Sequence, residues 1–323
     1  MKIEEFYEYV KENILSYLPK EYQEYMVELD KKHSINQTVV YGIILKSVGS
    51  RIAPVLRLDG VYEQYKNSPI QEVERCMPII AANFLQVIRQ DNFDCLEEDI
   101  IKQINSMEYI KDNICFRLIN AEMNKEFLKN RPHRMIAGLA VIYYIHLEDK
   151  DDKLSSIDIT YDYLNNRFSE LGEEQLFSFA KKNTPILCPV KISDLDSLVM
   201  SMIVKGQWQH DVEEVLEVWQ ASSSKMLVLT NSNGVYGATT MLYPGVLEIL
   251  KQELGEFVIL PSSVDEVLIV RMQPKQKISG LKDMIEEINA NTELVPKKKL
   301  LSNEIFTITP DGSSFEILPI EGD

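Results

Sequence analysis

Residues 261–266, with the sequence PSSVDE, place two hydroxyl groups and two carboxylates within six positions. A serine becomes a nucleophile when a base takes its proton and nearby donors stabilise the oxyanion that forms. Ser262, Ser263 and Asp265 are therefore candidate catalytic residues, with His210 as a candidate base. The chain has no G-x-S-x-G elbow, however, and serine and aspartate side chains in turns commonly bond to backbone groups. We favour this structural interpretation, because a turn between two strands needs such bonds anyway.

The histidines and cysteines do not form a recognisable metal or cofactor site. No two of the four histidines stand four positions apart, which is the spacing of a helical zinc site. His146 lies in an apolar run, and His210 precedes Asp211 at an expected helix start without a visible partner. The four cysteines are too far apart for a zinc ribbon or a redox dithiol. No phosphate-binding glycine motif occurs either. We expect no metal and no cofactor.

Two aspartates and several tyrosines are candidate binding residues. Asp194 and Asp196 could hold a divalent ion, but acids are also common at helix starts, which is the interpretation we favour. Tyr236 and Tyr243 could belong to a recognition surface, because tyrosine combines a large ring with a polar tip. Core packing explains such residues equally well. The other tyrosines considered are Tyr62, Tyr65, Tyr143, Tyr144, Tyr161 and Tyr163.

The charge balance argues against a nucleic-acid partner. The chain has 50 acidic and 34 basic residues and a formal net charge of −16. Such a chain repels phosphate backbones, and its only basic cluster is Lys297–Lys299. The longest apolar run, residues 135–145, is much shorter than the roughly 20 residues that span a bilayer. The first residues carry acids where a signal peptide needs bases, so we expect a cytoplasmic protein.

The first third of the chain predicts helices around one hairpin. Apolar residues recur at helical spacing up to Pro19, and a β-branched stretch then indicates a strand with a partner after a turn. A serine followed by a proline suggests a later helix start, and Pro78 should kink that helix. The acidic residues 91–99 suggest a loop. The predicted elements are helices 3–17 and 21–29, strands 38–45 and 51–58, and the kinked helix 68–88.

The remainder predicts a mixture of strands and helices. Residues 139–147 are almost wholly apolar, which is typical of a central buried strand. An Asn-Gly pair suggests a hairpin within residues 226–240, and Pro244 and Gly255 bracket a helix. Other expected strands are 114–118, 157–160, 257–260, 264–270, 305–308 and 315–318. Other expected helices are 173–182, 211–219 and 281–288, and residues 148–152 are expected to form a loop.

These elements predict an α+β fold in which antiparallel hairpins and sheets are backed by helices. We expect two subdomains, an N-terminal unit of residues 1–105 and a larger α+β unit of residues 106–323. The order strand, turn, strand, helix occurs at residues 38–88 and again at 226–254. The two stretches share little side-chain identity, so we interpret them as similar architecture and not as a repeat.

Several stretches resemble a clostridial family of domains of unknown function. The resemblance lies in residues 229–231, 236–238 and 242–244, and in the stretch from Ile259 to Val267. Arg57-Leu58-Asp59 and Pro132-His133 resemble its earlier portions, and the C-terminal part is distantly similar to YtpQ-like Firmicutes proteins. The resemblance covers most of the chain and implies a bacterial origin and a shared fold. It supplies no catalytic residues.

Three functional hypotheses follow. The first is a non-catalytic cytoplasmic binding or regulatory protein with a possible protein partner, since no catalytic set is visible. The second is a hydrolase or transferase that uses the turn from Ser262 to Glu266. The third is a mobile-element protein that acts by acidic surface mimicry, for which its charges would have to gather on one face. The oligomeric state is not predicted.

Overall fold

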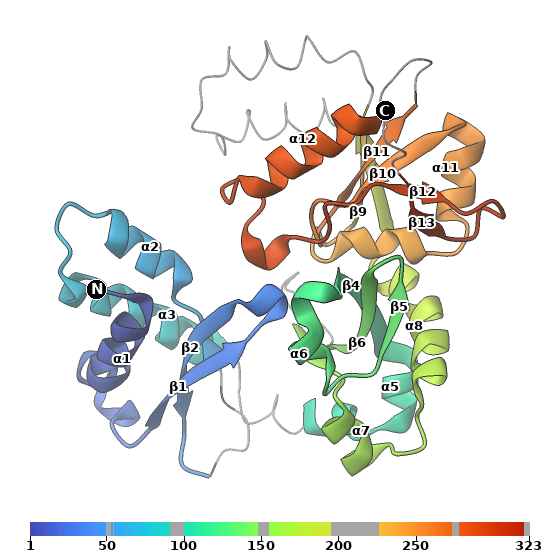
Figure 1. Cartoon of the computed structure of the whole chain (residues 1–323). Coiled ribbons are helices and arrows are strands. Elements are labelled where there is room, and N and C mark those ends of the chain that lie inside the picture. The colour runs from blue at the N-terminus through green and yellow to red at the C-terminus, as the bar shows by residue number, and fades with distance from the viewer. Residues whose placement is uncertain are drawn as a thin grey trace. The chain divides into compact units, whose positions relative to one another are not determined.

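The computed structural model describes residues 1–49, 53, 55–90, 100–147, 155–194, 226–272 and 278–319 (Figure 1). The chain divides into two compact units, Met1–Ser106 and Met107–Asp323. Each unit combines helices with antiparallel strands. This architecture confirms the predicted α+β class.

The first unit is built on a three-stranded antiparallel sheet with the order β1-β2-β3. Its core joins aromatic and aliphatic side chains from the helices to the inner face of β2, including Phe6, Tyr7, Ile43 and Phe84. The Tyr7 hydroxyl accepts a hydrogen bond from Leu58 N at 2.7 Å. The strands are β1 (Met26–His33), β2 (Val39–Lys46) and β3 (Val55–Leu56). The helices are α1 (Ile3–Asn13), α2 (Asp59–Asn67) and α3 (Met77–Gln90), with short 3-10 turns at Ile14–Tyr17, Lys20–Tyr22, Ile35–Gln37 and Val73–Arg75.

The predicted helix over residues 21–29 is wrong, because residues 26–29 belong to strand β1 and the helical part before them is only the 3-10 turn Lys20–Tyr22. Val27 and Leu29 alternate with polar neighbours and pack against the core, which is the two-residue period of a strand. All eight residues of β1 pair with β2. Among the described residues of the expected partner of β2, residues 51–58, Val55 and Leu56 form strand β3.

The predicted kinked helix over residues 68–88 forms only from Met77 onward, as helix α3, and its predicted start at Ser68 is wrong. Ser68 Oγ accepts a hydrogen bond from Ile70 N at 3.2 Å, so this serine closes a turn and does not cap a helix. Helix α3 begins at Met77, so Pro78 falls in its first turn, where no intrahelical N–H is required and no kink results. The sequence prediction also missed helix α2.

A four-stranded antiparallel sheet forms the first part of the second unit. Its central strand is β6 (Leu139–Leu147), as predicted. Strand β4 (Ile114–Asn120) pairs with β6 on one side. On the other side, β5 (His133–Ile136) pairs with residues 139–142 and β7 (Ser155–Asp158) with residues 144–147. Helix α8 packs against β4 and β6. The helical elements are α5 (Met107–Asn113), η5 (Glu122–Asn124), α6 (Lys125–Leu128), α7 (Tyr161–Arg167) and α8 (Glu173–Leu187).

A six-stranded antiparallel sheet forms the second part, with the order β13-β12-β10-β11-β9-β8. Helix α12 (Ile278–Ala290) packs on one face through Leu281 and Ile285, which join a buried cluster with Val258 and Val270. Helix α11 (Val246–Leu254) ends at Gly255, as its sequence predicted. The strands are β8 (Val190–Asp194), β9 (Met226–Asn231), β10 (Phe257–Leu260), β11 (Val267–Arg271), β12 (Phe306–Ile308) and β13 (Phe315–Ile317). The 3-10 helix η7 is Lys297–Lys299.

The hairpin predicted for residues 226–240 does not form. Its first half is strand β9, but its second half is the 3-10 helix η6 (Gly237–Leu242). Strand β9 already pairs with β11 on one side and β8 on the other, so no edge is left for a hairpin partner. The backbone turns away at Tyr236, which has a φ of 53°. The second example of the strand, turn, strand, helix order is therefore absent.

Three sequence predictions lie outside the described residues. These are the loops at 91–99 and 148–152 and the helix at 211–219.

Gly237 tests the close packing of η6 on β9. A Cβ atom at this position would collide with Thr230 Oγ1 and with the carbonyl oxygen of Asp265, and it would lie 2.7 Å from Asn231 N. Gly237→Ala should therefore lower the free energy of unfolding by about 3 kcal/mol, the upper range for overpacking. Gly280 is the matched control because it lies in α12 with open space around it. Gly280→Ala should raise the free energy of unfolding by roughly 0.5–1 kcal/mol.

Urea unfolding of the two variants measures both effects. Equal shifts of the two midpoints in the same direction would contradict the packing described for Gly237.

Candidate functional site

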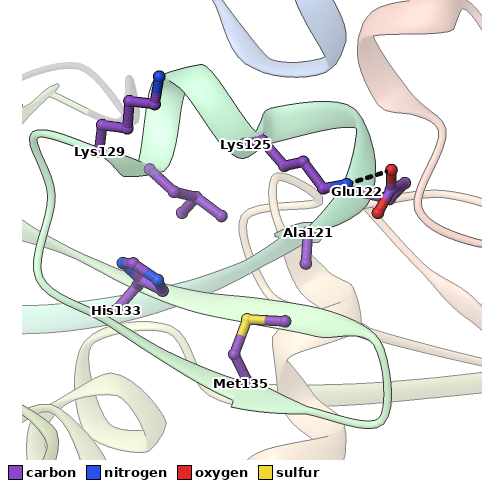
Figure 2. A pocket seen from close by; sticks show the side chains of 7 residues that line it. Ala121, Glu122, Lys125, Lys129, His133 and Met135 are labelled. Carbon is purple, nitrogen blue, oxygen red and sulfur yellow. Dashed lines mark hydrogen bonds and ion pairs between the residues drawn. The ribbon is translucent and has the colours of Figure 1, made fainter.

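A pocket of about 270 Å³ lies between strand β5 and the helical segment η5–α6 (Figure 2). His133 and Met135 point from β5 toward this segment, and Ala121 points back toward the strand (Figure 2). The methionine side chain is a large apolar group that is 56% exposed. The pocket is thus a mainly apolar recess with a flexible methionine at its edge, a residue that adapts to varied partners. The lining residues are Ala121, Glu122, Lys125, Leu128, Lys129, His133 and Met135.

Hydrogen bonds from Asn120 fix the turn that carries η5 over the sheet. Its side-chain oxygen accepts a bond from Met123 N at 2.8 Å, and its carbonyl accepts one from Asn124 Nδ2 at 2.7 Å. Asn120 Nδ2 donates to the carbonyl of Leu301 at 2.9 Å. The backbone N–H of Ala121 donates to Gly138 O at 3.3 Å. These bonds tie the η5 end of the pocket to the sheet.

Two lysines stand on the rim, one helical turn apart. Lys125 Nζ lies 2.5 Å from Glu122, and Lys129 Nζ lies 2.7 Å from Glu126. All four side chains are exposed, and such pairs contribute roughly 0–1 kcal/mol. Both lysines can therefore exchange their glutamate for an anionic ligand at little cost.

His133 offers a free ring nitrogen next to the apolar recess. Its Nδ1 lies 2.8 Å from the carbonyl oxygen of Arg131. A carbonyl only accepts, so Nδ1 carries the proton in this contact and Nε2 of the neutral ring is an acceptor. Within the described part of the chain, Nε2 has no hydrogen-bond partner. A ligand that donates a hydrogen bond could use it.

Behind the pocket, two arginines share one carboxylate on the same face of the sheet. Arg117 binds Asp158 Oδ1, and Arg131 Nη2 lies 3.3 Å from Asp158 Oδ2. The Arg117 guanidinium also stacks on Tyr236, at 4.6 Å from the ring centre, and on Tyr144, at 5.4 Å. Burial disfavours the charge on Arg117, but the pKa is raised overall by Tyr236 and Asp158. Arg117 is thus a fixed cation that anchors this layer of the unit.

The opposite face of the sheet carries a second cluster, in which one arginine binds a glutamate. Arg134 donates two hydrogen bonds to Glu173, at 3.1 and 2.9 Å, and its guanidinium stacks 4.0 Å from the Phe177 ring centre. The Tyr143 hydroxyl donates a further bond to Glu173. Burial alone would raise the pKa of Glu173, but the bonds from Arg134 and Tyr143 outweigh it and hold the pKa below 4.5. The start of α8 is thereby fixed to β5 and β6.

Two threonines occupy the outer edge of strand β4. Phe116 N donates to Thr184 Oγ1 at 3.2 Å, and Leu118 N donates to Thr239 Oγ1 at 3.3 Å. Thr184 lies on α8, and its hydroxyl donates a hydrogen bond to Ala180 O. Thr239 lies on η6. The hydroxyl groups thus satisfy backbone donors that a neighbouring strand would otherwise bind.

The turn at residues 261–266 is buried and internally bonded. Ser262 and Ser263 are 7% and 4% exposed. Asp265 accepts a bond from Tyr236 N at 3.1 Å and pairs with Lys299 at 2.5 Å, and its own N–H donates to Ser263 Oγ at 3.0 Å. Burial and the charge of Asp265 raise the pKa of Glu266. These contacts hold the turn and give a substrate little access to either serine.

The other sequence candidates do not gather around this turn. Asp194 is the last residue of strand β8, and the residues after it, where a helix start was expected, lie outside the described part of the chain. The Tyr243 hydroxyl is buried and donates to Cys188 O at 2.8 Å. Tyr236 is half-buried. Its ring lies against the Arg117 guanidinium, and its backbone N–H donates to the Asp265 side chain. Asp196 and His210 lie outside the described residues.

The pocket residues were not singled out by the sequence analysis. The sequence signals for these residues are weak. Lys125 and Lys129 stand four positions apart, and His133 and the apolar Met135 stand two positions apart. Such patterns are common on protein surfaces. Only the crossing of α6 over β5 brings them together.

Two general searches of the described residues found no further site. In that part of the chain, no three His, Cys, Asp or Glu side chains are grouped so that they could hold a metal ion. None of its helices has the length and apolar character needed to cross a membrane.

Comparison with known families identifies the group to which the chain belongs. A family model described as a family of unknown function, DUF5688, matches residues 3–308. The chain belongs to the DUF5688 family. The pocket, both arginine clusters and the 261–266 turn all lie inside the matched range. Comparisons of this DUF5688 chain with curated proteins and with solved structures gave no match.

The Glu173 contacts of this DUF5688 protein predict a pH-dependent loss of stability. A glutamate whose folded pKa is lowered stabilises the fold above its ordinary value of 4.5, and this contribution is lost as the pH falls through the lowered value. Tyr143→Phe removes a hydrogen bond to the charged carboxylate. It should lower the free energy of unfolding by about 1.5–3 kcal/mol at pH 7, and by less at a pH below the lowered pKa of Glu173.

Tyr243→Phe is the matched control, since this buried hydroxyl donates to a carbonyl that does not titrate. Urea unfolding at both pH values should give a loss for Tyr243→Phe that does not change with pH. A pH-independent loss for both variants would contradict the role given to Glu173.

Proposed function

We propose that the protein is a non-catalytic binding or regulatory protein, and that the pocket between α6 and β5 is its ligand-binding site. The observation that supports this proposal is an apolar recess with polar groups only at its rim, two lysines and the free Nε2 of His133. Ligand pockets combine apolar walls with a few orienting polar groups in this way. The seven lining residues include no serine, threonine or cysteine that could act as a nucleophile.

The volume and the charges define the ligand class. A pocket of about 270 Å³ is slightly smaller than the roughly 300–1,000 Å³ of sites for drug-sized molecules. It has room for one aliphatic side chain, such as that of leucine or methionine, together with the atoms next to it. Lys125 and Lys129 favour a carboxylate next to that group.

We also propose that the protein is a bacterial, cytoplasmic protein that does not bind nucleic acid. The net charge of −16 supports a protein that works without nucleic acid, and a cytoplasmic location belongs to the same proposal. The resemblance to clostridial and YtpQ-like proteins supports a bacterial origin. Acidic surface mimicry stays an alternative prediction, and so does a hydrolase or transferase at Ser262–Glu266. The burial of both serines does not favour the hydrolase or transferase.

N-acetyl-leucine is a suitable probe, because it carries one aliphatic side chain and one carboxylate. With about 0.3 kcal/mol per heavy atom, its dissociation constant should be roughly 1 mM. In protein labelled with ¹³C at the methionine methyl groups, the Met135 signal should shift and saturate, and N-acetyl-alanine should bind more weakly. Met135→Leu assigns the signal by its disappearance.

Met135→Asp should abolish this binding at little cost in stability, because the side chain is exposed. Met26→Asp is the matched control, since Met26 is 48% exposed on edge strand β1. The control should bind N-acetyl-leucine like the unaltered protein. The proposal fails if the Met135 signal stays unchanged at about ten times the expected dissociation constant, or if both variants lose binding equally.

A further inference from the structure

The outer edge of strand β5 has unpaired backbone groups. Ile136 and Leu139 flank the two-residue turn of Ala137 and Gly138, whose φ angles of 47° and 78° match a type I′ hairpin. The residues flanking such a turn exchange hydrogen bonds, and hydrogen-bonded pairs alternate with non-bonded pairs along the ladder. The N–H and C=O groups of His133 and Met135 therefore point away from β6.

No neighbouring strand occupies this edge in the part of the chain that the structure describes. Strand β5 ends the strand order β4-β6-β5, and its backbone makes no hydrogen bond on the outer side. The other edge of the same sheet is different, because Thr184 and Thr239 bind the outward N–H groups of β4. One edge is thus closed by hydroxyl groups, and the other is open to a further strand.

The pocket and the open edge share two residues. His133 and Met135 line the pocket with their side chains and provide the outward backbone groups. Successive side chains of a strand point to opposite faces, so a strand placed beside β5 would direct every second side chain to the face that carries α6. Strand addition combined with a side-chain pocket is a recurrent way to bind extended peptides.

The two rim lysines favour an acidic peptide. Residues 122–136 contain four cations, at positions 125, 129, 131 and 134, and two glutamates, and Asp158 and Glu173 balance the remaining two cations from other elements. Arg131 and Arg134 are bound to Asp158 and Glu173. Lys125 and Lys129 are held only by exposed glutamates one turn away, so they can bind carboxylates of an incoming peptide.

We propose that an extended acidic peptide pairs with the outer edge of strand β5 and inserts one aliphatic side chain into the pocket below α6. This inference rests on the proposed function and names its ligand class. The peptide needs carboxylates two positions before and after the aliphatic residue, because those side chains share its face.

The probe is a blocked, fluorescein-labelled peptide of five residues, with leucine at the centre, threonine on either side and aspartate at both ends. Fluorescence anisotropy with the full chain should give saturable binding that weakens as salt rises. Two N-methylated forms report the pairing, one methylated at the leucine and one at both threonines. Their methyl groups lie on opposite edges of the peptide strand.

One N-methylated form should bind about tenfold or more weakly than the parent, and the other within about threefold, because only one edge of the peptide faces β5. Equal affinity of both forms overturns the inference. If N-acetyl-leucine still shifts the Met135 signal in that case, the proposed function stands without strand addition. If neither probe binds, both proposals fail.

Variants of the rim test the charge contribution. Lys125→Gln and Lys129→Gln should each weaken binding of the aspartate peptide roughly two- to fivefold. Neither should change the affinity for a peptide with asparagine in place of aspartate. Lys66→Gln is the control, since Lys66 is an exposed lysine in the first unit with a similar glutamate pair. Equal effects on both peptides would overturn the selection of acidic ligands.

Analytical sedimentation of the protein alone tests whether a second copy of the chain, in place of a peptide, occupies the β5 edge. A monomer supports a foreign peptide at the β5 edge. A dimer that Met135→Asp dissociates, and Met26→Asp does not, would mean that a second copy of the chain occupies the edge, and it would overturn the inference.

Discussion

The second unit depends on the pairing of one buried strand along both of its edges. Strand β6 is almost wholly apolar and buried, and a backbone in such surroundings must bond all of its N–H and C=O groups. Strand β4 serves one edge, and β5 and β7 divide the other. Since β4 and β5 lie on opposite sides of β6, the connection between them must cross a face of the sheet. Helix α6 is that crossing, and the pocket is the space it leaves above β5.

The charged side chains of the two arginine clusters are tolerated because each one faces an opposite charge. On the face that carries α6, Asp158 joins Arg117 and Arg131, and on the other face Glu173 joins Arg134 and Tyr143. Breaking such a pair leaves a desolvated charge, which costs far more than the pair contributes. The two clusters therefore fix the register of the elements that they connect more than they add to stability. Both lie within reach of β5, the strand that borders the pocket.

The sequence predicted elements whose pattern is local. The apolar run of β6, the pair β10 and β11, and the Gly255 end of α11 were all found, because composition and end signals suffice there. Predictions failed where a neighbour decided the outcome. The Asn-Gly signal before Tyr236 could not reveal that β9 is paired on both sides, and nothing local distinguished β1 from a helix. The pocket needed the crossing of α6, so its residues could not be grouped from sequence.

The threonine hydroxyls on β4 have a consequence for how copies of the chain could associate. A linear fibre in which sheets pair edge to edge requires two complementary edges on each copy. One edge pairs with the preceding molecule, and the other pairs with the next. Thr184 and Thr239 remove one of these edges. Through this sheet the molecule can bind one further strand or form a symmetric dimer with a second copy. It cannot form an open-ended fibre through this sheet. Two side-chain oxygens thus set the stoichiometry of any strand exchange.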